Sequence, residues 1–386
     1  MININSKYAI IIGTTAEAIK TIPIMQEFQK RNIEYTFIHT GQHNLGTLCK
    51  KCKIKEPDIV INARNGFKGN TGGAFSWGLQ TLPKIVSYLK EKKDIEFVLV
   101  HGDTLSCGIS TIASKLAGKK VCHIEAGLRS GNLRSPWPEE LMRILTDAFS
   151  DVKFSPSVVS AKRLNGNVYN VGNTSYDALN FAISLKDIPK LDLTKKFVVV
   201  SIHRHEAIKN KFLMEKIVSN LAFCQLPTLW FMHENTHQKL LEYGLDNKLK
   251  QNKNLYILPP MEYFQFVNVL KSAQFIIGDG GSLADELSYL NVPYVCCREF
   301  TEREELLDRG DQELVGFDEE KNKLAIMKFS LPRKPYFIPS PYYNGDSASK
   351  QIVDILMSYS ILDTAKHIGG YDKFPKTHKY LKVSEQ

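Results

Sequence analysis

The stretch YAIIIGTTAEAIK, residues 8–20, joins a five-residue apolar run to a glycine turn and then to a helix-like segment. The run Tyr8–Ile12 is too uniformly apolar to alternate between a core face and a solvent face, so it predicts a strand covered on both faces. A glycine turn that opens a helix directly after such a strand is typical of a parallel βαβ unit. Free N–H groups at the start of that helix could hold an anion. However, residues 13–20 lack the GxGxxG and Walker patterns and fit a purely structural turn equally well.

The same succession of an apolar run, a polar or glycine turn and an amphipathic segment recurs along the chain, which predicts further parallel βαβ units. In the N-terminal half the expected strands are Tyr8–Ile12, Tyr35–His39, Phe97–Val100 and Val121–Ile124. In the C-terminal half they are Phe197–Val200, Thr228–Met232, Tyr256–Leu258, Phe275–Ile277 and Tyr294–Cys296. The stretch Ile183–Thr194 contains Pro189 and has no clear periodicity, so it is the expected linker.

Two domains of ordinary size are expected, because 386 residues are many for one hydrophobic core. The predicted fold is α/β with two Rossmann-like, doubly wound parallel sheets, one in residues 1–182 and one in residues 195–360. A polar, lysine-rich tail at residues 361–386 follows them. Ligands of such sheets bind outside the carboxyl ends of the strands. We therefore expect the polar turns of both domains to line one interdomain cleft.

Composition narrows the class of protein. A hydrophobic fraction of 43% and a charged fraction of 24% are typical of a globular chain. There is no run of roughly 18 apolar residues and no basic-then-apolar N-terminal segment, so we expect no membrane span, no secretory signal and a cytoplasmic location. The net charge of +9 fits a nucleic acid, a membrane surface or an anionic small molecule as partner, and does not choose among them.

The seven cysteines are an odd number spread through apolar segments. This pattern favours free thiols in a reducing compartment over a disulfide framework. Cys49 and Cys52 form a lone CxxC, but zinc would need a second pair and redox chemistry a thioredoxin-like context. An ordinary helix is the better interpretation of this segment.

Two carboxylates follow neighbouring expected strands of the N-terminal half. The strand Phe97–Val100 leads into His101-Gly-Asp-Thr104, and the strand Val121–Ile124 leads directly into Glu125. Carboxylates at such strand ends are costly to desolvate unless they are paired or used, and desolvation moves a carboxyl pKa toward the range useful for proton transfer. Asp103 could instead be the N-cap of a helix that starts at Thr104.

A third acidic segment, SPWPEE at residues 135–140, precedes an expected helix. Pro138 suits the first turn of that helix, and Glu139 and Glu140 suit its positive end. Glu139 and Arg143 lie four residues apart on one helix face, so a surface ion pair is the alternative interpretation for them.

The C-terminal half supplies two polar strand ends. SIHRHE at residues 201–206 places two histidines and an arginine after a strand, which suggests recognition of negative charge. A metal site is less favoured, because no further ligand falls at suitable spacing and Arg204 would repel a cation. The glycine-rich segment GDGGSLADE, residues 278–286, would let backbone amides approach a diphosphate closely. Its carboxylates could accept hydrogen bonds from ribose hydroxyls.

This ordered set of segments resembles the UDP-N-acetylglucosamine 2-epimerase family over residues 13–356. The most specific match is HIEAGLR at residues 123–129, followed by SPWPEE and Arg143. Further matches are HGDT (101–104), GNT with Asp177 (172–177), HRHE (203–206), and Arg298 with TER (301–303).

The resemblance implies a GT-B architecture, a cleft that closes on a nucleotide sugar, and a homodimer. It also implies an isomerase that interconverts UDP-N-acetylglucosamine and UDP-N-acetylmannosamine for surface polysaccharide synthesis. In this chemistry a base removes the C2 proton while UDP leaves C1, and UDP then adds back to the glycal. No cofactor, metal ion or nucleic acid is expected to take part.

Residue roles carried over from the family's motifs fall into three groups. The implied catalytic residues are Asp103, Glu125, Glu139 and His203. The implied substrate and UDP contacts are Lys20, Arg143, Arg204, Gly281, Ser282, Glu286, Arg298, Glu302 and Arg303. Gln42 and His43 match part of a regulatory sugar-nucleotide site of some members, although Phe67–Phe75 does not continue that match.

Departures from the family pattern leave alternatives open. Thr15 and Ala16 stand where the family usually has Arg-Pro, so a diphosphate-binding arginine is missing while Lys20 is kept. Gly280 replaces a usual serine and Ser282 a usual glycine. The first turn favours the non-hydrolysing branch, but a hydrolysing epimerase that releases UDP, a GT-B glycosyltransferase and a non-catalytic sensor remain alternatives.

Overall fold

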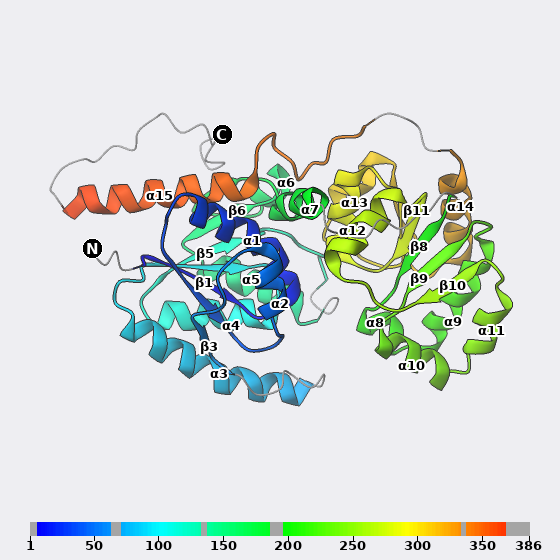
Figure 1. Ribbon diagram of the computed structural model, residues 1–386, viewed down its shortest axis with the longest axis horizontal. Coiled ribbons are helices and arrows are strands. Elements are labelled where there is room, and N and C mark those ends of the chain that lie inside the picture. Colours follow the sequence, from blue (N-terminus) through cyan, green and yellow to red (C-terminus); the bar gives the residue numbers. More distant parts are fainter. Residues whose placement is uncertain (1–5, 63–70, 133–136, 186–195, 333–336, 368–386) are drawn as a thin grey trace. The chain divides into compact units, whose positions relative to one another are not determined.

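A computed structural model describes residues 6–62, 71–132, 137–185, 196–332 and 337–367 (Figure 1). The chain divides into two compact units. Unit 1 comprises Met1–Ala178 and Tyr342–Gln386, and unit 2 comprises Leu179–Pro341. The division falls inside helix α7 (Thr174–Ser184), so the change of unit comes earlier than the predicted linker at 183–194, most of which lies outside the described residues.

The sheet of unit 1 has seven parallel strands in the order β3-β2-β1-β4-β5-β6-β7. This is the order of a doubly wound Rossmann sheet, whose topological switch point lies between β1 and β4. Its strands are β1 (Tyr8–Ile12), β2 (Tyr35–His39), β3 (Ile59–Val60), β4 (Phe97–His101), β5 (Lys120–Ile124), β6 (Val152–Ser155) and β7 (Asn167–Asn170). The four strands predicted for this half are confirmed, whereas β3, β6 and β7 were not predicted.

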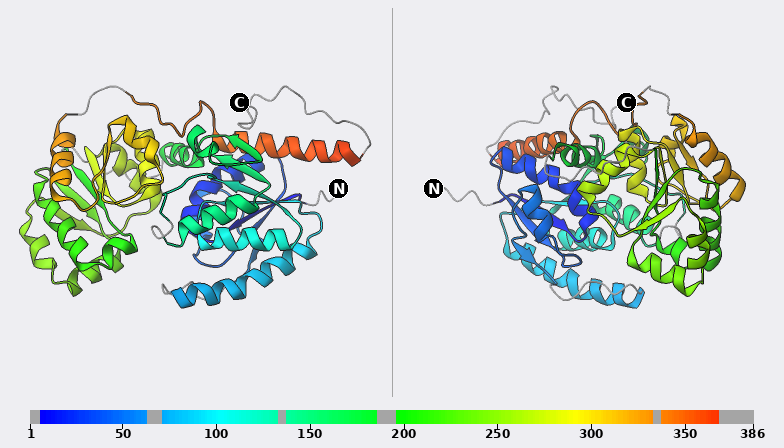
Figure 2. Two further views of the ribbon diagram at one scale, coloured as in Figure 1. Left: turned by 180° about the vertical axis from the view of Figure 1, so that it is seen from behind. Right: turned by 45° about the vertical axis from the view of Figure 1, so that its right-hand side comes forward.

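Helices cover both faces of this sheet, with α15 on one side and α3 on the other (Figure 2). The helices of unit 1 are α1 (Thr15–Lys30), α2 (Gly46–Cys52), α3 (Thr71–Glu91), α4 (Leu105–Leu116), α5 (Glu139–Phe149), α6 (Val158–Ala161), α7 and α15 (Ala348–His367). Tyr8 packs against Phe28 of α1, with ring centroids 5.3 Å apart, while its neighbour Ala9 lies in the cluster that includes residues of α3 and α4. Each face of the sheet is therefore buried, which explains the uniformly apolar strands.

Helix α15 corrects the predicted domain limits. The hydroxyl of Tyr8 donates to the carbonyl of Leu356, at 3.2 Å, so this helix packs on unit 1. The predicted second domain, 195–360, is thus too long at its C-terminal end. The predicted tail, 361–386, is helical as far as His367, and its remainder lies outside the described residues.

Unit 2 repeats the architecture with six parallel strands in the order β10-β9-β8-β11-β12-β13. Its strands are β8 (Val198–Ser201), β9 (Thr228–Phe231), β10 (Leu255–Leu258), β11 (Phe275–Gly278), β12 (Tyr294–Cys296) and β13 (Gln312–Leu314). Its helices are α8 (His205–Ile208), α9 (Lys211–Asn220), η1 (Leu221–Phe223), α10 (Glu234–Glu242), α11 (Asp246–Gln251), α12 (Tyr263–Ser272), α13 (Gly281–Leu290), η2 (Glu304–Arg309) and α14 (Glu319–Ser330). The five predicted strands are present with ends shifted by a residue or so, and β13 was not predicted. The α/β, GT-B-like fold class is confirmed, with one Rossmann-like sheet in each unit.

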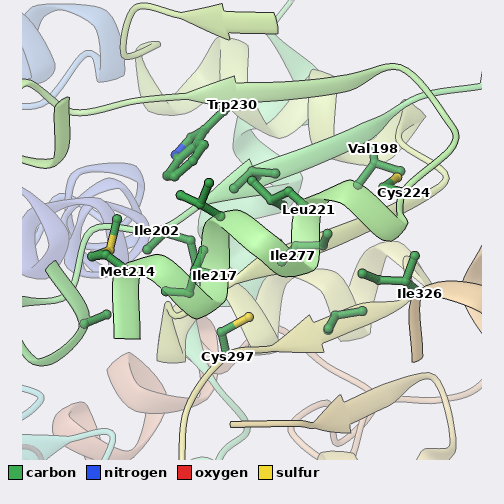
Figure 3. Packing of buried hydrophobic residues seen from close by; sticks show 14 of the residues in the cluster. Val198, Ile202, Met214, Ile217, Leu221, Cys224, Trp230, Ile277, Cys297 and Ile326 are labelled. Carbon is green, nitrogen blue, oxygen red and sulfur yellow. The ribbon is translucent and has the colours of Figure 1, made fainter. Parts of the chain in front are cut away.

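The core of unit 2 holds its sheet and helices in one block. Trp230 of β9 is fully buried, and Val198, Ile217 and Ile277 belong to the same cluster (Figure 3). Removing such a side chain to alanine typically costs about 2–5 kcal/mol, because a cavity adds to the lost transfer energy. The strand ends that carry polar residues are therefore anchored to a rigid scaffold.

All seven cysteines are buried free thiols, as expected. Burial raises the pKa of both Cys49 and Cys52, so the CxxC segment behaves as part of the core of unit 1. Within the described ranges, no helix has the length and apolar content needed to cross a membrane.

Candidate functional site

The turn between β1 and α1 is organised by Glu17. Thr14 is the N-cap of α1, and its side chain accepts from the backbone N–H of Glu17 at 3.2 Å. The Glu17 carboxylate accepts in return from the N–H groups of Gly13 and Thr14, both at 2.7 Å, in a capping box. The same carboxylate accepts from the hydroxyls of Thr104 and Ser106, which belong to the turn after β4. Burial, opposed by these hydrogen bonds, raises its pKa.

Glu17 therefore connects the turn after β1 with the turn after β4, at the switch point of the sheet. This role of Glu17 was not predicted from the sequence. We expect Glu17→Ala to lower the free energy of unfolding of unit 1 by about 2 kcal/mol, because it removes a helix cap and buried hydrogen bonds to a carboxylate. Glu17→Gln should lose less, since its amide can still serve both turns. The free energy of unfolding of both variants is measured by urea unfolding, with hydrogen exchange of the α1 amides as the probe. Equal stability of Glu17→Ala and the parent chain would contradict this role.

Glu125 lies directly after β5 with a backbone φ of 69°, a left-handed conformation that is strained for a residue with a side chain. Its carboxylate is buried and accepts from Lys20 Nζ, at 2.9 and 3.1 Å, and from Asn173 Nδ2, at 3.2 Å. His101 Nε2 lies 3.8 Å from Glu125 Oε2. Burial lowers the pKa of His101 to about 3, so this ring is neutral at physiological pH. The Lys20 ammonium lies against both oxygens of the Glu125 carboxylate, and an opposite charge at this distance favours the charged form of a buried acid.

Asp103 follows the neighbouring strand, since β4 and β5 pair with His101 opposite Ile124. The guanidinium of Arg143 donates to the Asp103 carboxylate and, at 3.0 Å, to Glu140 of its own helix. Arg143 is only 4% exposed, so interpreting its contacts as a surface ion pair was wrong. The N-cap of α4 is Thr104 and not Asp103, whose side chain is 29% exposed.

The remaining N-terminal candidates lie close to these turns in the sequence or the fold. Glu139 is the first residue of α5, with Pro138 as N-cap, while residues 133–136 of the preceding segment lie outside the described residues. His43 Nδ1 accepts from the backbone N–H of Thr15 at 3.0 Å, at the start of α1. Gln42 comes near the same turn, because its Oε1 would lie 2.5 Å from a Cβ added at Gly13. Part of the segment 67–75 is likewise outside the described residues.

In unit 2, β8 and β11 pair with Ser201 opposite Gly278, which brings their following turns together. Asp279 is 1% exposed and accepts from the backbone N–H groups of His203, at 3.0 Å, and Arg204, at 2.8 Å. Burial, opposed by His203 and Arg204, raises the pKa of Asp279. The Asp279 carboxylate is thus buried and bound to backbone N–H groups of its own unit. It is not available to accept hydrogen bonds from ribose hydroxyls, as was suggested for the carboxylates of this segment. The side chain of His203 is 44% exposed and lies 3.5 Å from Asp279 through Nδ1.

Helix α13 begins at Gly281 with Gly280 as N-cap and no side-chain cap. No capping side chain accepts from its first N–H groups. An anion-binding helix terminus requires such uncapped N–H groups. A Cβ at Gly281 would lie 2.4 Å from Glu302 Oε1, so the backbone can approach its neighbours this closely only without a side chain. Ser282 is the second residue of the helix, and Glu286 lies one turn later, near Tyr263. Burial and the nearby Glu286 carboxylate raise the pKa of Tyr263.

A buried network of ion pairs supports this helix start. Arg298 donates to Glu302 at 3.0 Å, and Arg303 donates to Glu302 and, at 2.8 Å, to Asp285. Asp285 is fully buried in this pair, so it too is unavailable to a ribose. Arg298, Glu302 and Arg303, which the resemblance assigns to substrate or UDP binding, thus lie together and contact one another and Asp285 of α13.

The fold and these turns define a class of protein, namely a two-unit α/β protein with one Rossmann-like sheet in each unit and polar turns at the carboxyl ends of the strands. One sheet presents buried and partly exposed carboxylates, and the other presents a glycine-rich helix start beside a histidine and arginines. Among the described residues, no group of three or more His, Cys, Asp or Glu side chains is placed to hold a metal ion.

Comparison with known proteins identifies the family. The family model described as UDP-N-acetylglucosamine 2-epimerase matches residues 26–357, and the chain belongs to that family. A UDP-N-acetylglucosamine 2-epimerase of Methanococcus maripaludis is 34% identical over 372 residues, which cover 91% of this chain and 98% of the relative.

Solved structures agree with this assignment. The crystal structure of Methanocaldococcus jannaschii UDP-GlcNAc 2-epimerase in complex with UDP-GlcNAc and UDP is similar with a TM-score of 0.78 and 28% identity, over 91% of this chain and 99% of that one. The S. aureus MnaA–UDP co-structure gives a TM-score of 0.79 and 25% identity, over 96% and 100% of the chains.

Proposed function

We propose that this chain is a UDP-N-acetylglucosamine 2-epimerase that interconverts UDP-GlcNAc and UDP-ManNAc for surface polysaccharide synthesis. The observation that carries the proposal is the buried Glu125 carboxylate, ion-paired with Lys20 at the carboxyl end of β5 and adjacent to the turn of Asp103. In a chain of this family, a buried carboxylate beside an ammonium suits abstraction of a weakly acidic C–H proton. The relatives' complexes with UDP-GlcNAc and UDP support the choice of substrate.

The reaction divides between the two units. In unit 1, one acid among Asp103, Glu125 and Glu139 takes the C2 proton, and the electron pair of that C–H bond becomes the C1–C2 double bond. As this double bond forms, the C1–O bond breaks and its electron pair stays on the β-phosphate oxygen of UDP. In unit 2, His203 and the α13 helix start would stabilise the charge that develops there, with Arg204, Ser282 and Glu286 holding the nucleotide. Return of UDP to C1 and of a proton to the other face of C2 completes the epimerisation.

Proton NMR in deuterated water tests the function directly. The purified full-length chain is incubated with UDP-GlcNAc, and deuterium at C2 together with UDP-ManNAc is the expected result. Free UDP with N-acetylmannosamine would indicate a hydrolysing enzyme, and absence of both would leave transfer to an acceptor or sensing, so either outcome refutes the proposal.

Thr15 offers a test of diphosphate binding. Its backbone N–H donates to His43 Nδ1 and its partly exposed hydroxyl lies 3.1 Å from the same nitrogen, so a longer side chain keeps the backbone contact and loses only the hydroxyl contact. We expect Thr15→Arg to lower KM for UDP-GlcNAc about 10-fold, because one charged donor to an anion contributes about 1.5–3 kcal/mol. Steady-state kinetics measure the effect, and Thr15→Gln is the neutral control. An arginine variant with the same KM as the glutamine variant would refute this explanation of the missing arginine.

A homodimer is the second part of the proposal, and the outer face of α5 supports it. Leu141 and Ile144 are each 39% exposed and Phe149 is 52% exposed, which leaves an apolar face opposite the buried Arg143. Exposed apolar patches of this kind commonly mark protein interfaces, and we place a second copy of the chain on this one. We expect Ile144→Glu to convert a dimer to a monomer in sedimentation velocity, whereas Leu324→Glu on α14 should not. A dimer that survives Ile144→Glu would place the interface elsewhere.

A cytoplasmic location is also part of the proposal. Seven buried free thiols in the described residues suit a reducing compartment, which is where nucleotide sugars would meet the enzyme.

A further inference from the structure

Three polar residues of α5 hold the turns that carry the candidate acids. Glu140, Arg143 and Asp147 are spaced i, i+3 and i+7, so they lie on one helix face, and all three are buried. Glu140 accepts from the backbone N–H of Ser130 at 3.0 Å, and Arg143 donates to Asp103. Asp147 is the closest of the three to the C-terminal end of α5, and the proposed reaction assigns it no role.

Asp147 contacts His123 of β5 and two groups of the segment that follows β5. His123 Nδ1 lies 2.7 Å from Asp147 Oδ1, while Arg129 and the backbone N–H of Gly127 contact Oδ2 at 2.7 and 3.2 Å. Burial alone would raise the pKa of Asp147, but the charges and hydrogen bonds of His123 and Arg129 lower it overall. Independently of His123, the Arg129 guanidinium and the Gly127 N–H at Oδ2 stabilise the ionised form of Asp147, and an ionised carboxylate can only accept hydrogen bonds.

The other ring nitrogen of His123 also faces an acceptor. His123 Nε2 lies 2.8 Å from the carbonyl oxygen of Gly102, the residue before Asp103, and the ring is fully buried. A backbone carbonyl cannot donate, so Nε2 must carry a proton, and the ionised Asp147 requires a proton on Nδ1 as well. A ring with both nitrogens protonated is an imidazolium cation.

His123 lies between the two turns that carry the candidate acids. His123 precedes Glu125 by two residues on β5, and its hydrogen bond fixes the Gly102 carbonyl on β4's turn. A Cβ added at Gly102 would lie 3.8 Å from Glu125 Oε2, so the two turns are in close proximity. The His123 contacts therefore connect the backbone before Asp103 with the strand that leads into Glu125.

We propose that His123 is a buried imidazolium which, with Asp147, positions the turns of Asp103 and Glu125 for proton transfer at C2. The catalytic half of this inference rests on the proposed epimerase function, whereas the charge state of His123 does not. His123 is a positioning residue, because it acts through the two turns and not on the substrate.

The charge state is tested by NMR of the full-length chain labelled with ¹⁵N-histidine. At neutral pH we expect both ring nitrogens of His123 to be protonated, with its signals assigned by their loss in His123→Gln. In Asp147→Asn the amide can donate to Nδ1 and still accept from Arg129, so His123 should become neutral with its proton on Nε2. A neutral His123 ring in the parent chain would overturn the proposal.

The positioning role is tested by kinetics of the same Asp147→Asn variant. We expect kcat and C2 deuterium exchange to fall about 10- to 100-fold, as for other partners that orient site residues, with KM for UDP-GlcNAc nearly unchanged. Asp151→Asn is the matched control, since Asp151 accepts from the backbone N–H of Val121 at 2.7 Å at the opposite end of β5. It should alter stability without altering kcat.

Two results separate the inference from the proposed function. Parental kcat in a folded Asp147→Asn variant would refute the positioning role. Absence of C2 exchange in the parent chain would instead refute the epimerase function, and the NMR signals of His123 would still decide its charge.

Discussion

Glu125→Gln should lose C2 deuterium exchange by about 10²- to 10⁴-fold, the range that a positioned acid or base contributes. The substitution keeps the shape of the side chain and can keep the hydrogen bond from Asn173, but the amide cannot take up the C2 proton. It also leaves the ammonium of Lys20 without its 2.9 Å carboxylate partner. The loss should therefore fall on kcat rather than on KM.

The comparison that isolates chemistry from binding uses calorimetry and NMR together. UDP binding should stay within about threefold of the parent chain, because Arg204, Ser282 and Glu286, which are proposed to hold the nucleotide, belong to unit 2 and are unchanged. Glu27→Gln is the matched control, since Glu27 of α1 also forms an ion pair, at 2.6 Å to Arg31, away from the site. Unaltered C2 exchange in Glu125→Gln would remove Glu125 from the mechanism.

The fold followed from the sequence where a buried strand is a continuous apolar run, whereas the buried internal strand Val152–Ser155 was missed because its sequence, VKFS, includes a lysine and a serine. Phe97–His101 and Phe275–Gly278 are continuous apolar runs in the middle of their sheets, so composition alone indicated them. Other missed strands, such as Ile59–Val60 and Gln312–Leu314, are two or three residues long and lie at sheet edges. Strands this short have no periodicity to detect. Helix α15 could not be assigned to unit 1, because that pairing depends on a contact between Tyr8 and Leu356.

The candidate site was only partly predictable for a related reason. Charged residues at strand ends, such as Asp103 and Glu125, could be recognised because turns after buried strands are where ligands bind. The residues that hold those turns could not be separated from ordinary surface charges. Glu140 and Asp147 resemble exposed helix residues, and only the i, i+3, i+7 spacing with Arg143 in EELMRILTD hinted at a shared buried face. Asp279 was mistaken for a ligand residue because its partners are backbone N–H groups, which leave no pattern in the side chains.

Arg143→Met should lower the free energy of unfolding of unit 1 by about 3–5 kcal/mol, the usual result of removing one member of a buried ion pair. Arg143 is 4% exposed and Glu140 2% exposed, so methionine fills the space but leaves the Glu140 carboxylate desolvated beside an apolar side chain. Asp103, which is partly exposed, can be hydrated and should contribute less. Urea unfolding with hydrogen exchange in α4 and α5 measures the change.

A double variant distinguishes the uncompensated charge from lost packing. In Arg143→Met/Glu140→Gln the unpaired Glu140 carboxylate is gone and the amide still accepts from Ser130, so about 1–2 kcal/mol of the loss should return. Arg163→Met, at an exposed position on the same unit, should change stability by no more than about 0.5 kcal/mol. Were the double variant less stable than Arg143→Met alone, the Glu140 carboxylate would have to be stabilised by other groups. The ion pair at Arg143 would then serve to orient Asp103 and not to neutralise α5.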